Sequence, residues 1–250
     1  MSELENILNK LLKGELSIKE AATEIKKMYV KETMKLTLDI SRAFRRDIPE
    51  IVWGEGKSAS ELARAVKATA ERNGYAIATR VDFDKYRKAV RSLKGLKVEF
   101  FKEASILRAF SNSYVPIKKK GCVGIVAAGT SDISVAEEAR IVAETLGLEA
   151  ICAYDVGVAG LYRLLDSLGR MIGKAEVYIA VAGMEASLPS VLAGLVDRPV
   201  IAVPTSTGFG VGVGGLLALA SSLQSCPMGV ATVNIDGGAQ AAVFAYMILK

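Results

Sequence analysis

Residues 121–155 read GCVGIVAAGTSDISVAEEARIVAETLGLEAICAYD, and this stretch contains the clearest indication of the fold. Its two apolar runs, 123–127 and 150–154, are separated by a helical segment at 134–146. Continuous apolar strands joined by helices are typical of a parallel sheet that is covered on both faces. The stretch therefore predicts the beginning of an α/β domain.

The same alternation continues to residue 250. Further apolar runs predict strands at 177–182, 200–203 and 229–233. Further segments of helical character lie at 160–172, 188–195, 214–224 and 239–249. We therefore expect residues 121–250 to form one α/β domain, with a parallel sheet and helices on both faces. Ligands of such sheets bind at the carboxyl ends of the strands.

The earlier part of the chain has a different pattern. Apolar residues at helical spacing predict a helical hairpin and a connecting strand within residues 1–46, with Ser17 opening a capping box for the second helix. Residues 47–115 alternate strand-like and helical segments, and Ser58 is placed to cap a helix. They predict a small α/β or α+β domain, and the segment 111–120 is the expected linker.

Composition excludes several classes of protein. Hydrophobic residues make up 51% of the chain and charged residues 24%, as in globular rather than disordered proteins. The first residues lack the apolar core of a signal peptide, and the weakly charged stretch 199–234 is interrupted by prolines and glycines, unlike a membrane-spanning helix. We therefore expect a cytoplasmic protein without membrane contact. Histidine is absent, so acid/base chemistry must fall to other side chains.

Charge divides the chain into two parts. Residues 1–120 contain 26 Lys and Arg against 16 Asp and Glu, whereas residues 121–250 contain 6 against 11. The basic part could meet the phosphates of a small ligand, or its lysines could simply form solvated helix faces. Its basic runs are not interleaved with several aromatic residues, so nucleic acid is not an expected partner.

The first strand of the predicted domain is followed by a turn with the sequence Gly129, Thr130, Ser131 and Asp132. Glycine and hydroxyl residues at the start of a helix offer backbone N–H groups and the positive end of the helix dipole to an anion. An ordinary helix cap at Ser131 or Asp132 is the alternative interpretation.

Carboxylates follow the next two strands. Asp155 comes after the second strand, and Glu185 comes after the third, two residues beyond Gly183. Small and apolar neighbours would suit Glu185 to the role of a general base. A turn carboxylate at Asp155 and an exposed glutamate in the first helical turn at Glu185 are the alternatives.

A glycine-rich loop follows the fourth strand and begins at Thr205. From Gly208 onward it holds five glycines in eight residues, too many for packing alone, which suggests close approach to a ligand or a mobile loop. Cys226 lies between a helix and the last strand, an atypical place for a buried filler residue. Cys122 and Cys152 lie in or beside strands and are predicted to be structural. The residues alone thus predict a nucleotide-sized anionic ligand at the strand ends.

These motifs, in this order, resemble the aminoimidazole ribonucleotide carboxylase/mutase family of purine synthesis. The resemblance is carried by GTSD (129–132), AGMEASLP (182–189), PVIAVP (199–204) and CPMGVATVNIDGGA (226–239). The purine enzymes have a catalytic histidine, which this chain lacks. The sequence is more similar to the pyridinium-3,5-biscarboxylic acid mononucleotide synthases of the nickel-pincer nucleotide cofactor pathway. That similarity is carried by YDVGVAGL (154–161), IPEIVWGEGK (48–57) and ATRV (78–81).

The resemblance implies a substrate, nicotinic acid adenine dinucleotide, and two reactions. Carbon dioxide supplies a second carboxylate at carbon 5 of the pyridinium ring, and hydrolysis of the phosphoanhydride releases AMP. Cys226 would add to ring carbon 6 as the nucleophile. Glu185, with Asp155 as the second candidate, would remove the carbon-5 proton. Magnesium is the implied cofactor, and a homo-oligomer, an octamer by resemblance to the purine enzymes, is the implied assembly.

Binding roles follow from the same resemblance. The turn residues Gly129, Thr130, Ser131 and Asp132 would hold phosphate or ribose, with Asp132 as the candidate magnesium ligand. The remaining substrate-binding candidates are Gly183, Thr205, Gly208 and Arg80, of which Arg80 would pair with the nicotinate carboxylate or the phosphates. Tyr162 stands where the synthase family often has histidine. Two other functions stay open: a purine-pathway carboxylase or mutase, and a non-catalytic nucleotide-binding module.

Overall fold

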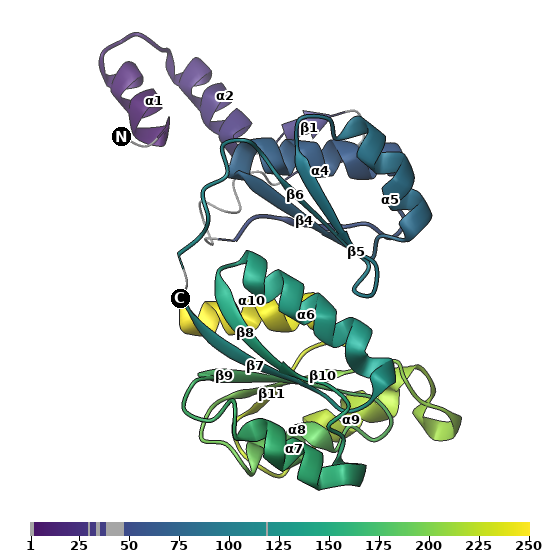
Figure 1. Cartoon of the computed structure of the whole chain (residues 1–250). Helices are drawn as coiled ribbons and strands as arrows, with labels where there is room; N and C mark the ends of the chain where they lie inside the picture. Colours follow the sequence, from purple (N-terminus) through teal and green to yellow (C-terminus); the bar gives the residue numbers. More distant parts are fainter. Residues whose placement is uncertain (1–2, 30, 34–35, 39–47, 119) are drawn as a thin grey trace. The chain divides into compact units, whose positions relative to one another are not determined.

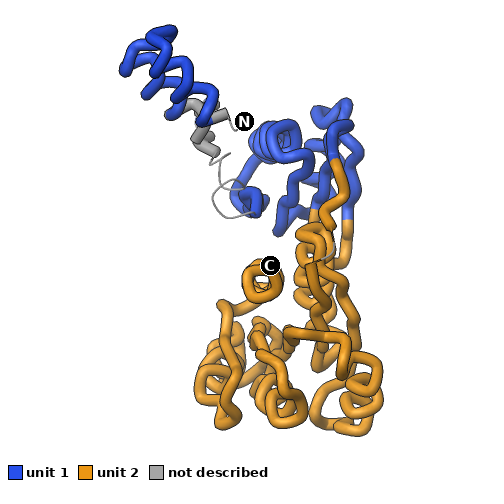
Figure 2. Tube along the Cα trace, turned by 90° about the vertical axis from the view of Figure 1, so that its left-hand side faces the viewer, with its two compact units in different colours: residues 1–100, 107–114 blue, residues 101–106, 115–250 orange. Residues whose placement is uncertain are grey.

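The structure is a computed structural model, and it describes residues 3–29, 31–33, 36–38, 48–118 and 120–250. The chain divides into two compact units (Figure 2). The first comprises residues 1–100 and 107–114, and the second comprises residues 101–106 and 115–250. The final passage into the second unit, between Tyr114 and Val115, falls in the segment that the sequence indicates as a linker.

The second unit contains an all-parallel sheet, as the sequence predicts. Its strands are β7 (Gly121–Ala127), β8 (Leu148–Ala153), β9 (Val177–Ala182), β10 (Val200–Pro204) and β11 (Val230–Thr232). They are ordered β11-β10-β9-β7-β8, and each neighbouring pair is parallel. The predicted fold class is therefore confirmed.

Helices cover both faces of this sheet. They are α6 (Ile133–Thr145), α7 (Leu161–Leu168), α8 (Leu188–Ala193), α9 (Leu216–Leu223) and α10 (Gly238–Leu249), with the 3₁₀ turns η2 (Thr130–Asp132), η3 (Val158–Gly160) and η4 (Gly210–Gly215). Figure 1 shows α6 and α10 on one face and the other helices on the opposite face. Among the described residues, no helix is long and apolar enough to cross a membrane.

The burial of the sheet explains why its strands are apolar at successive positions. Every residue of β9 is buried, because side chains that alternate between two covered faces all meet protein. Close packing also requires small residues. A Cβ atom on Gly124 in β7 would lie 2.7 Å from the ring of Tyr178. On the α6 face, a Cβ atom on Gly238 would lie 2.3 Å from the carbonyl oxygen of Val135, so α10 packs against α6 with backbone nearly in contact.

The first unit begins with a helical hairpin and continues with a small mixed sheet. Its elements are α1 (Glu3–Leu12), α2 (Ile18–Tyr29), β1 (Lys31–Thr33), β2 (Leu36–Leu38), β3 (Ile51–Trp53), α4 (Ala59–Asn73), β4 (Tyr75–Thr79), α5 (Phe83–Ala89), η1 (Val90–Ser92), β5 (Lys97–Phe101) and β6 (Ile106–Phe110). The mixed sheet has the order β3-β4-β6-β5. The remainder of the connecting segment, 39–47, lies outside the described residues.

Local sequence signals explain the helix boundaries of the first unit. Ser17 forms the capping box that the sequence indicates, with Glu20 as the reciprocal partner. Ser58 caps α4 as predicted, and the structure adds Glu61 as its reciprocal partner in a capping box. β6 is not predicted by the sequence pattern. It pairs antiparallel with β4 and continues directly from β5 through a short connection.

Candidate functional site

The strand order of the second unit indicates where a ligand would bind. β7 is the first strand of the sheet, β8 lies on one side of it and β9 on the other. Open parallel sheets bind ligands at the carboxyl ends of their strands, beside the point where the strand order reverses. The candidate site therefore consists of the segments that follow the strands, 128–132, 154–157, 183–187, 205–208 and 233–236.

Asp132 connects two of these segments. Its carboxylate is buried, and Oδ1 accepts a hydrogen bond of 2.7 Å from the hydroxyl of Thr205, which follows β10. Oδ2 accepts a 3.0 Å hydrogen bond from the backbone N–H of Gly129. A buried carboxylate needs such partners to offset its lost hydration. The predicted residues Gly129, Asp132 and Thr205 are thus brought together.

Gly129, Thr130 and Ser131 surround this contact and remain accessible. Thr130 and Ser131 are exposed, in the turn directly before α6. A Cβ atom on Gly129 would meet Asp132 Oδ2 at 3.6 Å, which is an ordinary contact distance, so the backbone has room for a neighbour. N–H groups at the start of a helix suit an anion. That role stays a prediction.

The segment after β9 packs tightly on the segment after β10. A Cβ atom on Gly183 would lie 2.5 Å from the carbonyl oxygen of Thr207 and 2.6 Å from the hydroxyl of Thr205. The backbone N–H of Met184 donates to the same Thr207 carbonyl at 2.8 Å. Packing is therefore sufficient to require glycine at position 183, and its predicted contact with substrate stays a prediction.

Glu185 is exposed, which matches the alternative interpretation of its environment rather than an apolar pocket. One of its carboxylate oxygens accepts a 2.8 Å hydrogen bond from the hydroxyl of Ser187. The two residues that flank Glu185, Met184 and Ala186, have positive φ angles of 52° and 47°. The sequence thus located a carboxylate at the strand end, whereas its accessibility had to come from the structure.

Asp155 lies at the end of β8 and is also exposed. Its carboxylate forms an ion pair with Arg163 of α7, a residue that the sequence analysis did not single out. Tyr162, beside Arg163, is exposed. The segment is fixed to β7, because the N–H of Val156 donates to the carbonyl of Ala127 at 3.0 Å.

Left-handed backbone conformations gather in these segments. In the described part of the chain, the non-glycine residues with positive φ include Asp155, Met184, Ala186 and Asp236. Such conformations cost on the order of 1–3 kcal/mol each and are concentrated at functional sites. Asp236 was missed as a site candidate. It accepts a 2.8 Å hydrogen bond from the N–H of Ser206, and its place after a strand is the same signal that singled out Asp155.

The glycine-rich loop after β10 has its own structural reasons for glycine, which corrects the argument that packing could not explain it. A Cβ atom on Gly208 would lie 2.5 Å from the carbonyl oxygen of Gly212, and one on Gly215 would lie 2.6 Å from that of Thr205. Gly210, Gly214 and Gly215 have positive φ angles. The turn therefore demands several of these glycines without any ligand, and the binding role of Gly208 stays a prediction.

Cys226 is exposed. Its neighbour Ser225 shares a 2.8 Å hydrogen bond with the hydroxyl of Ser190 on α8. Cys226 precedes β11, whereas the other candidates of this unit follow strands. Its neighbour Ser225 contacts α8, the helix that begins three residues after Glu185, and joint action of Cys226 and Glu185 stays a prediction. Cys122 and Cys152 are half-buried in β7 and β8, and burial raises the pKa of the Cys152 thiol.

Arg80 belongs to the first unit, where it follows β4. It has a positive φ of 57°, and its guanidinium carbon lies 5.5 Å from the centre of the Trp53 ring, a cation–π contact. Gly54, which follows Trp53, allows the chain to come this close to the end of β4. A Cβ atom on Gly54 would lie 2.7 Å from the carbonyl oxygen of Thr79, the residue before Arg80.

The carboxylates do not form a metal cage by themselves. Within the ranges that the structure describes, no group of three or more Cys, Asp or Glu side chains is placed to hold a metal ion. Both oxygens of Asp132 already accept hydrogen bonds. A magnesium site would therefore need oxygen ligands from the substrate and water, as is common for this ion.

The all-parallel sheet flanked by helices is consistent with an AIR carboxylase-like domain. The chain belongs to the AIR carboxylase family, because the model of that family matches residues 122–250. Residues 30–110 match a second model, described as the LarB/PurE-like N-terminal domain. The family is carboxylase- or mutase-like, which indicates that the chain is an enzyme.

Known relatives fall into two groups. An uncharacterized protein of Methanocaldococcus jannaschii is 45% identical over 252 residues, which cover 99% of this chain and 97% of that protein. The N5-carboxyaminoimidazole ribonucleotide mutase of the same organism is 40% identical over 128 residues, 50% of this chain and 76% of the mutase. The mutase of Pyrococcus abyssi is 37% identical over 133 residues, 51% of this chain and 73% of the mutase. The likeness to mutases thus concerns about half of the chain.

Proposed function

We propose that this chain converts nicotinic acid adenine dinucleotide, carbon dioxide and water to pyridinium-3,5-biscarboxylic acid mononucleotide and AMP. The observation that carries the proposal is the exposed Cys226 of an AIR carboxylase domain in a chain without histidine. The additional N-terminal domain of residues 30–110 supports this reaction over that of the purine mutases, because the mutases match only about half of the chain.

The chemistry of the ring calls for a nucleophile such as Cys226. Carbon 5 of a pyridinium ring is electron-poor and does not attack carbon dioxide. Addition of the Cys226 thiolate to carbon 6 forms a C–S bond and moves the positive charge off the ring nitrogen, which leaves a dienamine that is nucleophilic at carbon 5. Carbon 5 then forms a bond to carbon dioxide and becomes tetrahedral. Loss of its proton to a base, followed by departure of the thiolate, restores the aromatic ring with its new carboxylate.

Glu185 is the proposed base, and Asp155 is the second candidate. Glu185 is the more accessible acceptor, because Asp155 is paired with Arg163. Phosphate or ribose would be held by Gly129, Thr130 and Ser131, with Gly183, Thr205 and Gly208 around them, and Arg80 would pair with an anionic group of the substrate. Magnesium would neutralise phosphate charge when bound.

The decisive experiment is an assay with defined substrates. The full chain is incubated with nicotinic acid adenine dinucleotide and ¹³C-labelled bicarbonate, and the products are measured by mass spectrometry. We expect AMP together with a mononucleotide that carries one additional labelled carboxylate. Dinucleotide that remains unchanged would overturn the proposal. AMP formed together with an unlabelled mononucleotide would show hydrolysis of the phosphoanhydride without carboxylation.

A purine-pathway activity is the second candidate, because N5-carboxyaminoimidazole ribonucleotide mutases are 40% and 37% identical to about half of the chain. The missing histidine disfavours it. The same assay with N5-carboxyaminoimidazole ribonucleotide decides between the two. Turnover of the ribonucleotide without turnover of the dinucleotide would favour the mutase. Binding of nucleotides without turnover of either would indicate a non-catalytic module.

A further inference from the structure

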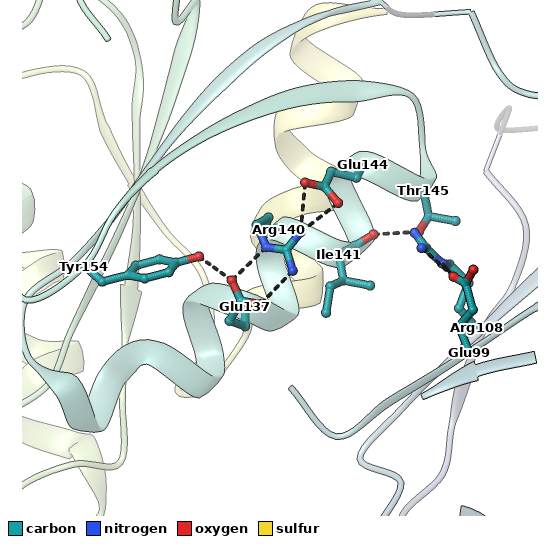
Figure 3. A network of polar contacts seen from close by, with 8 residues as sticks. All are labelled: Glu99, Arg108, Glu137, Arg140, Ile141, Glu144, Thr145 and Tyr154. Atoms are coloured by element: carbon teal, nitrogen blue, oxygen red, sulfur yellow. Dashed lines mark hydrogen bonds and ion pairs between the residues drawn. The ribbon is translucent and has the colours of Figure 1, made fainter. Parts of the chain in front are cut away.

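A chain of polar contacts connects helix α6 to the segment that carries Asp155 (Figure 3). The hydroxyl of Tyr154 donates a hydrogen bond to Oε1 of Glu137. Arg140 binds the same carboxylate through two hydrogen bonds of 2.7 Å, in which Nε donates to Oε1 and Nη2 donates to Oε2. Its third nitrogen, Nη1, bonds both oxygens of Glu144 at 2.9 Å.

This network is suited to hold one geometry. The side chains of Glu137 and Arg140 are only 15% and 26% exposed, and two parallel bonds between a guanidinium and a carboxylate fix their relative orientation. The Arg140 guanidinium, together with the Tyr154 hydroxyl, holds the pKa of Glu137 below its ordinary value, so Glu137 is a charged acceptor at neutral pH. Burial and neighbouring groups raise the pKa of Tyr154, so its hydroxyl keeps the proton that it donates.

Asp155 needs support from its surroundings. Its φ of 56° is in the left-handed region, which a non-glycine residue adopts at a cost. On its carboxyl side, the N–H of Val156 is bonded to the carbonyl of Ala127, and Gly157 lies so close to Ala128 that a Cβ atom would be 2.8 Å from its carbonyl oxygen. On its amino side, the side chain of Tyr154 provides the anchor.

We propose that Glu137 is a positioning residue, which fixes Asp155 at the strand-end site through the hydroxyl of Tyr154. Helix α6 begins directly after Asp132, which is itself bonded to Thr205. The same helix therefore holds the segments after β7 and β8 at a defined separation. The inference rests on the proposed function only in placing Asp155 at the site of reaction.

A first test needs no activity. Hydrogen exchange is measured on the full chain for the wild type, Tyr154→Phe and Glu137→Ala. Both variants should exchange the amides of Val156 and Gly160 about tenfold faster, while the amides of β9 keep the wild-type rate, because only the segment after β8 has lost its anchor. Wild-type exchange at Val156 and Gly160 in both variants would overturn the proposal.

Control variants distinguish a positioning role of Glu137 from a general loss of stability. Tyr246→Phe removes a hydroxyl that accepts a bond from Lys120, and Glu144→Gln alters the other carboxylate on Arg140. Neither should change exchange at Val156 and Gly160. Glu137→Gln should restore slower exchange than Glu137→Ala, because the amide oxygen of glutamine still accepts from Tyr154. A global rise in exchange in all of these variants would show a merely structural role and contradict the proposal.

A second test uses the proposed reaction. Tyr154→Phe should lower kcat about tenfold with little change in KM. In a chain that already carries Asp155→Ala, the same substitution should cause no additional loss of kcat, because the effects of substitutions at coupled residues are not additive. Additive losses would contradict positioning through Asp155. A wild-type chain that does not convert the dinucleotide would refute the proposed function, whereas the exchange result would still decide the role of Glu137.

Discussion

For single residues, the Asp132–Thr205 contact gives a clear expectation. Thr205→Val keeps the shape of a buried side chain but removes the donor to Asp132 Oδ1. A buried acceptor that loses a partner costs about 1–3 kcal/mol, so the free energy of unfolding in urea should fall by that amount. Thr145→Val is the matched control, because its buried hydroxyl donates to a helix carbonyl, that of Ile141. Equal losses in the two variants would contradict a special role for the Asp132 contact.

The three cysteines should differ in reactivity. Cys226 is exposed, whereas Cys152 is half-buried and burial raises the pKa of its thiol. Because thiolate is the reactive form, iodoacetamide at pH 8 should modify Cys226 first, as followed by peptide mass mapping. Cys226→Ser should lose the rapid phase of modification and nearly all carboxylation. Cys122→Ser and Cys152→Ser should retain turnover, and full carboxylation by Cys226→Ser would refute the covalent mechanism.

Residue types at strand ends could be read from the sequence, but their surroundings could not. The position of Asp132 after a strand was sufficient to select it, yet its bond to Thr205 spans 73 residues and depends on how the sheet is assembled. The exposure of Glu185 and the pairing of Asp155 with Arg163 depend likewise on the path of the loops. Positive φ angles at Met184 and Ala186 leave no signal in residue type, because neither residue favours them.

Among the secondary-structure elements, the contact between α6 and α10 can be tested directly. Gly238→Ala would place a Cβ atom 2.3 Å from the carbonyl oxygen of Val135. The two helices would have to separate, and overpacking of this kind costs about 1–3 kcal/mol. Urea unfolding should show that loss. In Gly194→Ala the new atom would meet the carbonyl oxygen of Val191 at 3.5 Å, an ordinary contact, so this control should remain close to wild type.

The contact between α6 and the end of β8 should make stability depend on pH. The pKa of Glu137 is lowered by Arg140 and Tyr154, so its contribution is present above the unfolded pKa of about 4.3 and is lost as the pH falls through the folded value. The stability difference between wild type and Glu137→Gln should therefore be larger at pH 6 than at pH 3. Urea unfolding at both pH values measures it, and a difference that does not change with pH would contradict the assignment.

The elements of the second unit were predicted well because their strands are apolar runs, buried at every position in β9 and β10, and because helical segments separate these runs. Misplaced boundaries have local causes. The helix expected at 160–172 begins after η3 and ends at Leu168, where Gly169 follows and the chain continues in turns. The sequence pattern did not predict β6, because this short strand is defined by its pairing with β4, a contact that is distant in sequence.

For the whole molecule, we expect a homo-oligomer formed by the second unit. Large apolar side chains are exposed around η4, α9 and β11, including Val211 at 89% and Met228 at 94%. Apolar groups concentrated in one region of a chain usually mark an interface. Light scattering at micromolar concentration should give several times the monomer mass, and an octamer is the expected state.

Variants at this apolar region sharpen that expectation. Leu216→Glu or Met228→Glu should lower the measured mass, because a buried unpaired charge opposes association. Val115→Glu is the matched control, since Val115 is 78% exposed elsewhere in the second unit. A monomeric wild type would refute the assembly.

The packing of α10 on α6 has a consequence for synthesis of the chain. The strand–helix–strand segment from β7 to β8 leaves the ribosome early, but the helix that covers α6 is encoded about a hundred residues later. Until residues 238–249 have emerged, α6 has an uncovered apolar surface that can bind chaperones or neighbouring nascent chains. Arrest peptides placed after increasing chain lengths should thus register folding force for this domain only once α10 has cleared the exit tunnel.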